Sequence, residues 1–168
     1  NEKLDIAVIG VSRRGGANLG GVRSQNIVAL CDVDANALDK AAKGFPKAAK
    51  FADFRKMLDK MHNQIDAVVV STPDHTHAPA AAMAMRMGKH CYCEKPLTHT
   101  VRECRTLIEL AAKNKLVTQM GTQIHANSNY RRVVEIVQSG MIGSVGKVHG
   151  WHTVTYGTKG GAKDTPPA

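Results

Sequence analysis

Short, uninterrupted apolar runs alternate with helical stretches along most of this chain, and this alternation constrains its fold more than any other feature. The clear runs are residues 6–9, 27–31 and 67–70, and the weaker ones are residues 48–51, 90–93 and 116–118. A strand that is apolar at every position is covered on both faces, as in a parallel sheet. The pattern therefore predicts a doubly wound α/β fold, with a parallel sheet between two layers of helices.

Residues that cap helices stand where the alternation requires them. The predicted helices span residues 35–43, 53–60, 78–87, 100–114 and 129–139. Asp34 and Asp53 are suited to cap the first two, and Thr100 with Glu103 forms a capping box. These signals support the helix positions independently of the apolar pattern.

The character of the chain changes after residue 118. The last predicted helix is followed by strand-like residues 145–155 and by a tail rich in Gly and Pro. A lone strand with an open edge is not a stable module. We therefore expect two parts: the doubly wound domain over residues 1–123, and a linking helix with the first strand of a truncated second domain over residues 124–168.

Composition excludes several classes of protein. With 43% hydrophobic and 22% charged residues, the chain resembles ordinary globular proteins, and no apolar run approaches the ~20 residues of a membrane span. The formal charge of +9 is spread along the sequence, and aromatic residues make up only 4%. We therefore expect neither a nucleic acid nor a membrane as partner.

The cysteines indicate a reduced interior. Cys31, Cys91 and Cys93 fall in predicted strands, and their spacing is not that of a zinc site. We expect a cytoplasmic protein. Because the chain begins with Asn1 rather than Met, export to the periplasm after removal of a leader stays open.

A glycine-containing turn follows the first predicted strand. A dinucleotide fingerprint reads G-x-G-x-x-G, and here Gly10 and Gly15 match while Ser12 occupies the place of the second glycine. The serine hydroxyl could itself donate to a phosphate. Arg13 and Arg14 lie inside the turn, which we expect to bind a pyrophosphate.

Asp32 ends the second predicted strand, 22 residues beyond Gly10. A carboxylate there accepts hydrogen bonds from ribose hydroxyls and repels a 2′-phosphate, which favours NAD over NADP. Asp34 is the competing residue, but it already has a role as a helix cap. The alternative for Asp32 is a simple turn residue at a strand end.

The segment Ser71-Thr72-Pro73-Asp74-His75-Thr76-His77 follows the strand at residues 67–70. It lies at the carboxyl edge of the predicted sheet, where ligands bind in open α/β folds. The His-x-His pattern also occurs in metal hydrolases, with Asp74, Glu94 or His99 as possible further ligands. We expect a cofactor-binding turn without a metal.

Glu94-Lys95-Pro96 follows the strand at residues 90–93. Lys95 is placed to hydrogen-bond a reacting oxygen and to transfer its proton. A cis Lys95–Pro96 bond would turn the chain and aim the lysine inward, with Glu94 holding its ammonium group. The alternative is a solvated surface lysine beside a proline that ends the strand.

Together these motifs resemble the glucose–fructose oxidoreductase, inositol dehydrogenase and rhizopine-catabolism family (Gfo/Idh/MocA). The resemblance covers about Leu4 to Trp151 and is most specific in STPDHTHA, GKHCYCEKPLTHT and GTQIHANSNYRRVVEIVQSGMIG. It implies a Rossmann domain that binds NAD(P), paired with a C-terminal α/β domain on a large open sheet. Ser12 departs from the family's second glycine. The expected cofactor-binding residues are Gly10, Ser12, Arg13, Arg14, Gly15, Asp32, Ser71, Thr72, Pro73, His77, Glu94, Lys95 and Gln123.

The resemblance implies an NAD-dependent oxidoreductase. Its substrate would be a small sugar or polyol whose hydroxyl contacts Lys95 as the catalytic residue, while hydride passes to the nicotinamide. Two alternatives stay open, an NAD-dependent glycoside-cleaving enzyme of the same family and an NAD-binding regulatory module without catalysis. We expect a homo-oligomer at full length and no turnover by the 168-residue chain alone.

Overall fold

The computed structural model describes residues 3–151 and contains the strands that the apolar runs predict. They are β1 (Asp5–Ile9), β2 (Asn26–Cys31), β3 (Ala49–Phe51), β4 (Ala67–Val70), β5 (His90–Glu94) and β6 (Thr118–Gly121). All six pair in parallel, in the order β3-β2-β1-β4-β5-β6. The doubly wound parallel sheet expected from the sequence is confirmed.

Helices connect successive strands. They are α1 (Arg14–Gly21), α2 (Ala35–Ala42), α3 (Phe54–Met61), α4 (His77–Arg86), α5 (Val101–Lys113) and α6 (Ser128–Gln138), with short 3₁₀ turns at η1 (His62–Gln64), η2 (Asp74–Thr76) and η3 (Gln123–Ala126). Asp34 and Asp53 cap α2 and α3 through their side chains, and Thr100 and Glu103 form the predicted capping box.

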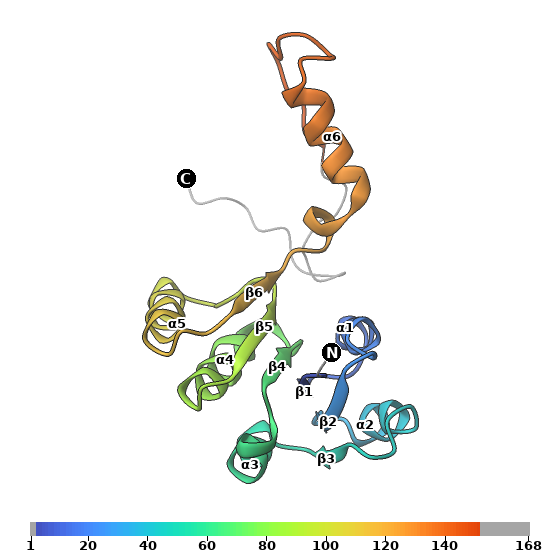
Figure 1. Ribbon diagram of the computed structural model, residues 1–168, viewed down its shortest axis with the longest axis vertical. Coiled ribbons are helices and arrows are strands. Elements are labelled where there is room, and N and C mark those ends of the chain that lie inside the picture. Colours follow the sequence, from blue (N-terminus) through green and yellow to red (C-terminus); the bar gives the residue numbers. More distant parts are fainter. Residues whose placement is uncertain (1–2, 152–168) are drawn as a thin grey trace, which may run out of the picture. The chain divides into compact units, whose positions relative to one another are not determined.

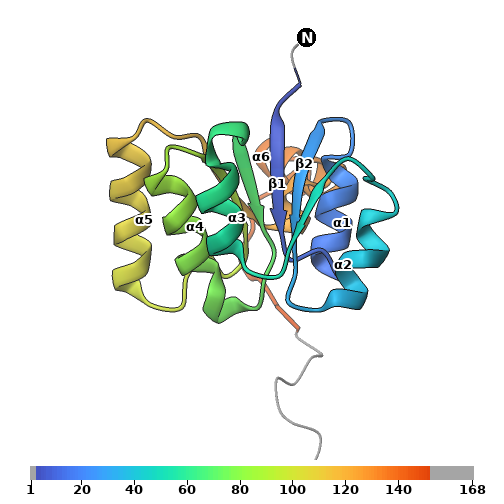
Figure 2. The ribbon, with the colours of Figure 1, turned by 90° about the horizontal axis from the view of Figure 1, so that it is seen from below.

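The sheet separates two apolar layers. Figure 1 shows α3, α4 and α5 on one side of the strands and α1 and α2 on the other; Figure 2 gives a second view. Side chains alternate between the faces, so Ala7 and Ile9 pack with α3 and α4, while Ile6 and Val8 pack with α1 and α2. Both faces of the central strands are therefore buried.

The chain divides into two compact units, Asn1–Ile124 and His125–Ala168. The first unit holds the whole sheet. In the second, α6 forms where a helix was predicted, and none of its residues is buried. The assignment of residues 124–168 to a truncated substrate domain stays a prediction.

Two predicted strands differ from the structure. The strand expected at residues 116–118 is instead β6, which begins at Thr118. β6 is an edge strand of the sheet, and its residues Thr118, Gln119 and Met120 are exposed, so it has no apolar run from which its position could be predicted. The strand expected at residues 145–155 is absent over residues 145–151, where no described segment offers it a pairing partner. Residues 152–155 lie outside the described part of the chain.

Candidate cofactor site at the carboxyl edge of the sheet

The predicted site residues of the first unit gather at the carboxyl edge of the sheet. Parallel strands end at the same edge, and the strand order places β1 beside β4 although two strand–helix units separate them in sequence. The amide of Ser71 donates to the carbonyl of Ile9 at 2.8 Å, which joins the turns after these two strands. Such a reversal of strand order is where open α/β sheets bind their ligands.

The turn between β1 and α1 requires its two glycines. Gly10 has a φ of +83°, and a Cβ on it would stand 2.5 Å from the carbonyl oxygen of Ser71. A Cβ on Gly15 would stand 2.0 Å from the carbonyl oxygen of Gly10. Neither position accepts a side chain, so the turn, the start of α1 and the end of β4 pack main chain against main chain.

The start of α1 leaves its amide groups uncapped by the N-cap side chain. Arg13 is the N-cap residue, has a φ of +47° and makes no side-chain capping bond. Ser12 is exposed at the same turn, where the fingerprint has its second glycine. An uncapped helix start with an exposed serine beside it is suited to an anion such as a pyrophosphate.

Asp32 links the turn after β1 to the start of α2. Its carboxylate accepts from the amide of Val11 at 2.9 Å and from the amide of Asp34 at 3.0 Å. The side chain is thereby held in place, and each oxygen keeps a lone pair for a further donor such as a ribose hydroxyl. Asp34 caps α2 through Asn36 and Ala37, so the competing residue has the structural role that the sequence predicted.

A groove of about 550 Å³ lies beside this turn, between α1 and α2. Ser12, Arg13, Asp34 and Lys40 are among the residues that line it. The groove therefore has two cationic side chains, Arg13 and Lys40, in its lining, together with Asp34, two residues after Asp32. Their presence bears on cofactor choice, because a 2′-phosphate would meet both these cations and the carboxylate.

Glu94 is buried at the end of β5, with 4% of its surface exposed. Its Oε1 accepts from Arg14 Nε at 2.9 Å, from Asn18 Nδ2 at 2.9 Å and from the Tyr92 hydroxyl at 3.2 Å. Burial raises the pKa of Glu94, but the hydrogen bonds from Arg14 and Asn18 outweigh it and hold the pKa below its ordinary value. This cluster joins α1 to β5.

The Glu94 cluster corrects one expectation. The sequence interpretation gave Glu94 to the ammonium group of Lys95, whereas the structure gives its carboxylate to α1. Alternate residues of β5 face the same side, so Tyr92 and Glu94 share the α1 face, and β5 ends before Lys95. The sequence interpretation missed Asn18 and Tyr92. Asn18 stands four residues after Arg14, and Tyr92 two residues before Glu94, which are the spacings of a shared face.

The turn after β4 contains a buried hydroxyl and a buried histidine. The Oγ1 atom of Thr72 is buried and has no hydrogen-bond partner among residues 3–151. His77 is 1% exposed, and its ring contacts the carbonyl oxygens of Pro96, through Nδ1 at 2.6 Å, and of Thr72, through Nε2 at 2.7 Å. Both ring nitrogens are therefore occupied, and the geometry favours a supporting position for His77 over direct contact with a cofactor.

Lys95 is exposed immediately after β5, and the Lys95–Pro96 peptide bond is cis, as the sequence interpretation considered. Pro73 is exposed after β4, and Gln123 is exposed after β6 at the start of η3. The edge of the first unit thus carries every predicted site residue. Their roles as cofactor ligands stay predictions.

The described residues contain no group of three His, Cys, Asp or Glu side chains placed to hold a metal ion. The two histidines of the His-x-His pattern do not form a shared metal site. His75 is exposed, whereas both ring nitrogens of His77 contact main-chain oxygens. Across residues 3–151 no helix is long and apolar enough to cross a membrane.

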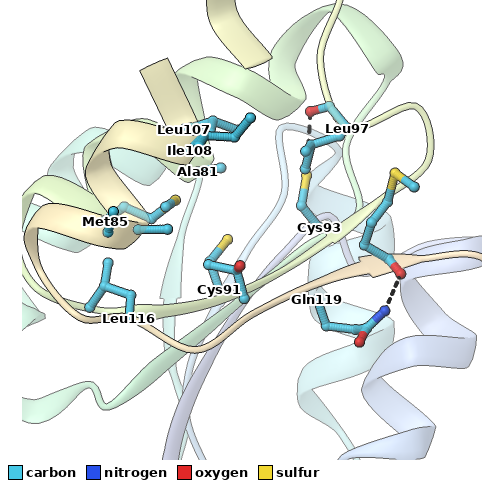
Figure 3. A pocket seen from close by; sticks show the side chains of 13 residues that line it. Ala81, Met85, Cys91, Cys93, Leu97, Leu107, Ile108, Leu116 and Gln119 are labelled. Atoms are coloured by element: carbon cyan, nitrogen blue, oxygen red, sulfur yellow. Dashed lines mark hydrogen bonds between the residues drawn. The ribbon is translucent and has the colours of Figure 1, made fainter. Parts of the chain in front are cut away.

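An apolar cavity of about 430 Å³ lies away from these residues, among α4, α5, β5 and β6. Figure 3 shows Met85, Leu107, Leu116 and the thiols of Cys91 and Cys93 around it. Burial raises the pKa of both thiols to about 12, and that of Cys31 in β2 likewise. These three cysteines are free, buried core residues, as predicted, and Cys104 is free and half-buried.

The edge has the features that a dinucleotide requires. The main chain at Gly10 and Gly15 packs so closely on neighbouring main chain that no Cβ fits, and the Thr72 hydroxyl is a buried polar atom without a partner in the described part of the protein. Asp32 has carboxylate oxygens with lone pairs left for a further donor, and α1 begins directly after the turn. The residues present therefore fit NAD.

Comparison with known proteins agrees with this geometry. Residues 4–122 match the family described as "Oxidoreductase family, NAD-binding Rossmann fold" (GFO_IDH_MocA). A glycosyl hydrolase family 109 protein of Shewanella pealeana is 33% identical over 166 residues, covering 89% of this chain and 34% of the relative. Inositol 2-dehydrogenase of Salmonella typhimurium is 28% identical over 155 residues, covering 89% and 46%.

A solved structure shares the fold. Scyllo-inositol dehydrogenase of Lactobacillus casei, with bound NAD(H) and scyllo-inositol, superposes with a TM-score of 0.74 at 26% identity, covering 84% of this chain and 43% of that one. The chain thus spans about a third to a half of the length of the proteins it matches. With residues 4–122 matched, this chain belongs to the Gfo/Idh/MocA oxidoreductase family and carries its NAD-binding Rossmann fold.

Proposed function

We propose that the full-length protein is an NAD-dependent oxidoreductase that acts on a hydroxyl of a sugar or polyol. The observation that carries this proposal is the meeting of the glycine turn, Asp32 and the Lys95 segment at one edge of the sheet. An inositol is the first substrate class to test, because relatives in both comparisons are inositol dehydrogenases.

The first half of the edge would hold the cofactor. The main chain from Gly10 to Gly15 and the start of α1 would bind the pyrophosphate, with Ser12 and Arg13 beside it. Asp32 would accept hydrogen bonds from the adenosine ribose. When bound, NAD supplies the hydride acceptor, and the protein's task is to orient it.

The second half would hold the reacting end. The segment Ser71–Pro73, with the Gln123 side chain after β6, would line the nicotinamide side. Lys95 would hydrogen-bond the substrate oxygen, stabilise the negative charge that develops there and exchange its proton with it. Glu94 would hold this segment against α1 through Arg14 and Asn18.

The test is an assay of the full-length protein with NAD and a panel of inositols, aldoses and acyclic polyols. We expect NADH formation, followed by absorbance, with at least one of these compounds, and saturable NAD binding by calorimetry. Binding of NAD with no turnover of any compound would favour a regulatory module. Absence of NAD binding would overturn the assignment of the site.

A second function has a specific observation in its favour. The relative at 33% identity is a glycosyl hydrolase family 109 protein, and so is another at 32%. A glycoside-cleaving enzyme that regenerates its NAD would release sugar from an aryl glycoside without net formation of NADH. Chromogenic glycosides assayed beside the polyols separate the two functions by this difference.

Assembly as a homo-oligomer, the absence of nucleic-acid binding and the cytoplasmic location stay predictions. So does the lack of turnover by the 168-residue chain alone. Sedimentation of the full-length protein measures the first, and the polyol assay repeated on the shorter chain measures the last.

A further inference from the structure

We propose that Asn18 of α1 is a positioning residue that presents the Ser71 hydroxyl as a hydrogen-bond donor to the bound cofactor. It does so by bridging Ser71, which follows β4, to Glu94, which ends β5. The inference deepens the proposed function and rests on it, because the cofactor that Ser71 would contact is NAD. The bridge itself consists of two hydrogen bonds within the protein.

The carboxamide of Asn18 makes both hydrogen bonds through its nitrogen atom. Nδ2 donates to the hydroxyl oxygen of Ser71 at 2.8 Å and to Oε1 of Glu94 at 2.9 Å. The amide nitrogen carries two N–H groups, so one of them serves each partner. Asn18 therefore joins the residues at the ends of two neighbouring strands to a single helix.

Glu94 determines which end of the Asn18 carboxamide faces the two partners. Arg14 donates from Nε to the same Oε1 atom at 2.9 Å. Since arginine can only donate, this oxygen acts as an acceptor. If the carboxamide oxygen of Asn18 stood in the place of Nδ2, two acceptors would face each other, which is unfavourable. The nitrogen of Asn18 therefore faces Glu94, and with it Ser71.

The bridge leaves the Ser71 hydroxyl with a proton to donate. A hydroxyl has one O–H group and two lone pairs, and the bond from Asn18 occupies one lone pair. No hydrogen bond within residues 3–151 has the Ser71 hydroxyl as its donor. Ser71 is half-buried, so the residue stays partly accessible to a ligand.

Ser71 stands beside the glycine turn that we propose binds the cofactor. A Cβ on Gly10 would lie 2.5 Å from the carbonyl oxygen of Ser71, and a Cβ on Gly15 would lie 3.3 Å from the Cβ of Ser71. Open α/β sheets bind their ligands where the strand order reverses, which here is between β1 and β4. A donor at this place is suited to an oxygen atom of a dinucleotide.

The experiment is a double-mutant cycle on NAD affinity, measured by calorimetry with the full-length protein. Ser71→Ala removes the donor and should weaken NAD binding roughly 2- to 10-fold, the effect of losing one hydrogen bond. Asn18→Ala lets the hydroxyl turn away and should weaken binding within the same range. Asn63→Ala, at an exposed asparagine in η1, is the matched control and should leave the affinity unchanged.

The double variant decides whether Asn18 acts through Ser71. If it does, the protein with both Asn18→Ala and Ser71→Ala binds NAD as Ser71→Ala does, within about twofold. Losses that multiply in the double variant would assign Asn18 a merely structural role and refute the positioning.

Asn18→Asp tests the direction of the hydrogen bonds and replaces Asn18→Ala in the cycle if that variant does not fold. It keeps the size of the side chain, but an ionised carboxylate only accepts hydrogen bonds, so it would take the Ser71 proton and repel Glu94. We expect NAD affinity to fall at least as far as in Ser71→Ala. Affinity equal to that of the wild type would overturn the proposal, because the site would then need only the volume of the side chain.

The same titrations separate this inference from the proposed function. A wild-type protein that does not bind NAD refutes both. NAD binding by the wild type with losses that multiply in the double variant refutes the inference alone. Because affinity is measured and not turnover, the result is the same for a dehydrogenase and for a glycoside-cleaving enzyme.

Discussion

The two halves of the carboxyl edge are built from different materials. Around β1 and β2 the binding surface is main chain, made accessible by Gly10 and Gly15 and flanked by one carboxylate. Around β4 and β5 it is a layer of buried side chains, chiefly His77 and Glu94, beneath one exposed lysine. The first half is suited to hold a ligand, and the second to direct a side chain at it.

This contrast separates binding from chemistry in a testable way. A substitution in the first half should alter cofactor affinity, since its groups would contact the cofactor's phosphates and ribose. A substitution in the second half should alter turnover, since we propose that Lys95 acts there and the buried Glu94 directly precedes it in the chain. Each prediction below would sharpen this division or break it.

The largest effect is expected at Lys95. Lys95→Met removes the proposed acid–base group and should lower kcat/KM of the full-length enzyme by roughly 10²–10⁴-fold, with NAD affinity nearly unchanged. Steady-state kinetics with the best polyol and NAD calorimetry measure both. Lys113→Met, at an exposed lysine in the last turn of α5, is the control. A loss below about threefold would return Lys95 to the solvated surface and end the division.

The next largest effect concerns cofactor choice in the first half. Hydrogen bonds to a charged group are worth ~1.5–3 kcal/mol, so Asp32 should favour NAD over NADP by roughly 10- to 150-fold. Asp32→Asn should narrow this ratio mainly by raising NADP affinity, because Arg13 and Lys40 line the adjacent groove. Calorimetric titrations of both cofactors at one ionic strength give the ratio, with Asp59→Asn on α3 as control. Equal or tighter NADP binding by the wild type would reject the role of Asp32.

A third prediction tests the buried layer by pH. The folded pKa of Glu94 is lowered, so its contribution to stability is complete above its ordinary pKa of 4.5 and is lost as pH falls from there through the folded pKa. Glu94→Gln should therefore cost about 1–2 kcal/mol at pH 7, allowing for the partly exposed Arg14, and progressively less in acid. Urea unfolding at several pH values measures this difference. A cost that is independent of pH would show that the charge of Glu94 contributes nothing.

The smallest effect is expected at Ser12. Ser12→Gly restores the fingerprint and should leave NAD affinity equal or better, while Ser12→Val adds a branched side chain at the turn and should weaken binding by up to about tenfold, or ~1.4 kcal/mol. The comparison of these two variants by calorimetry is internally controlled. Normal binding by Ser12→Val would mean that the pyrophosphate lies elsewhere than against this turn.

Elements with strong local signals were predictable from the sequence. The runs at residues 6–9, 27–31 and 67–70 became β1, β2 and β4, because strands buried on both faces must be apolar throughout. Capping residues placed the helix starts, since an N-cap contacts only its own first turn. An edge strand such as β6 needs no apolar run, and the strand predicted at residues 116–118 is found at Thr118–Gly121.

The side-chain partners at the site were less predictable than its location. Sequence order shows which residues stand at strand ends, and a parallel sheet brings those ends together. It does not show which neighbouring group a carboxylate will bind. The prediction that Glu94 binds the ammonium group of Lys95 was wrong, because Glu94 forms its ion pair with Arg14 on α1. The His77 ring likewise contacts both Thr72, after β4, and Pro96, after β5. No local sequence pattern indicates a contact between residues so far apart in the chain.

The buried thiols could report, through their reaction rates, when the interior of the sheet domain becomes exposed. A thiol reacts as the thiolate, and Cys31, Cys91 and Cys93, whose pKa values are raised to about 12, are shielded within strands on either side of the β1–β4 junction. An alkylating reagent should modify the half-buried Cys104 first and reach the others only when the helices that cover this face move away from the sheet. Residue-resolved alkylation rates would then time how often each flank of the junction exposes its interior, with no probe added.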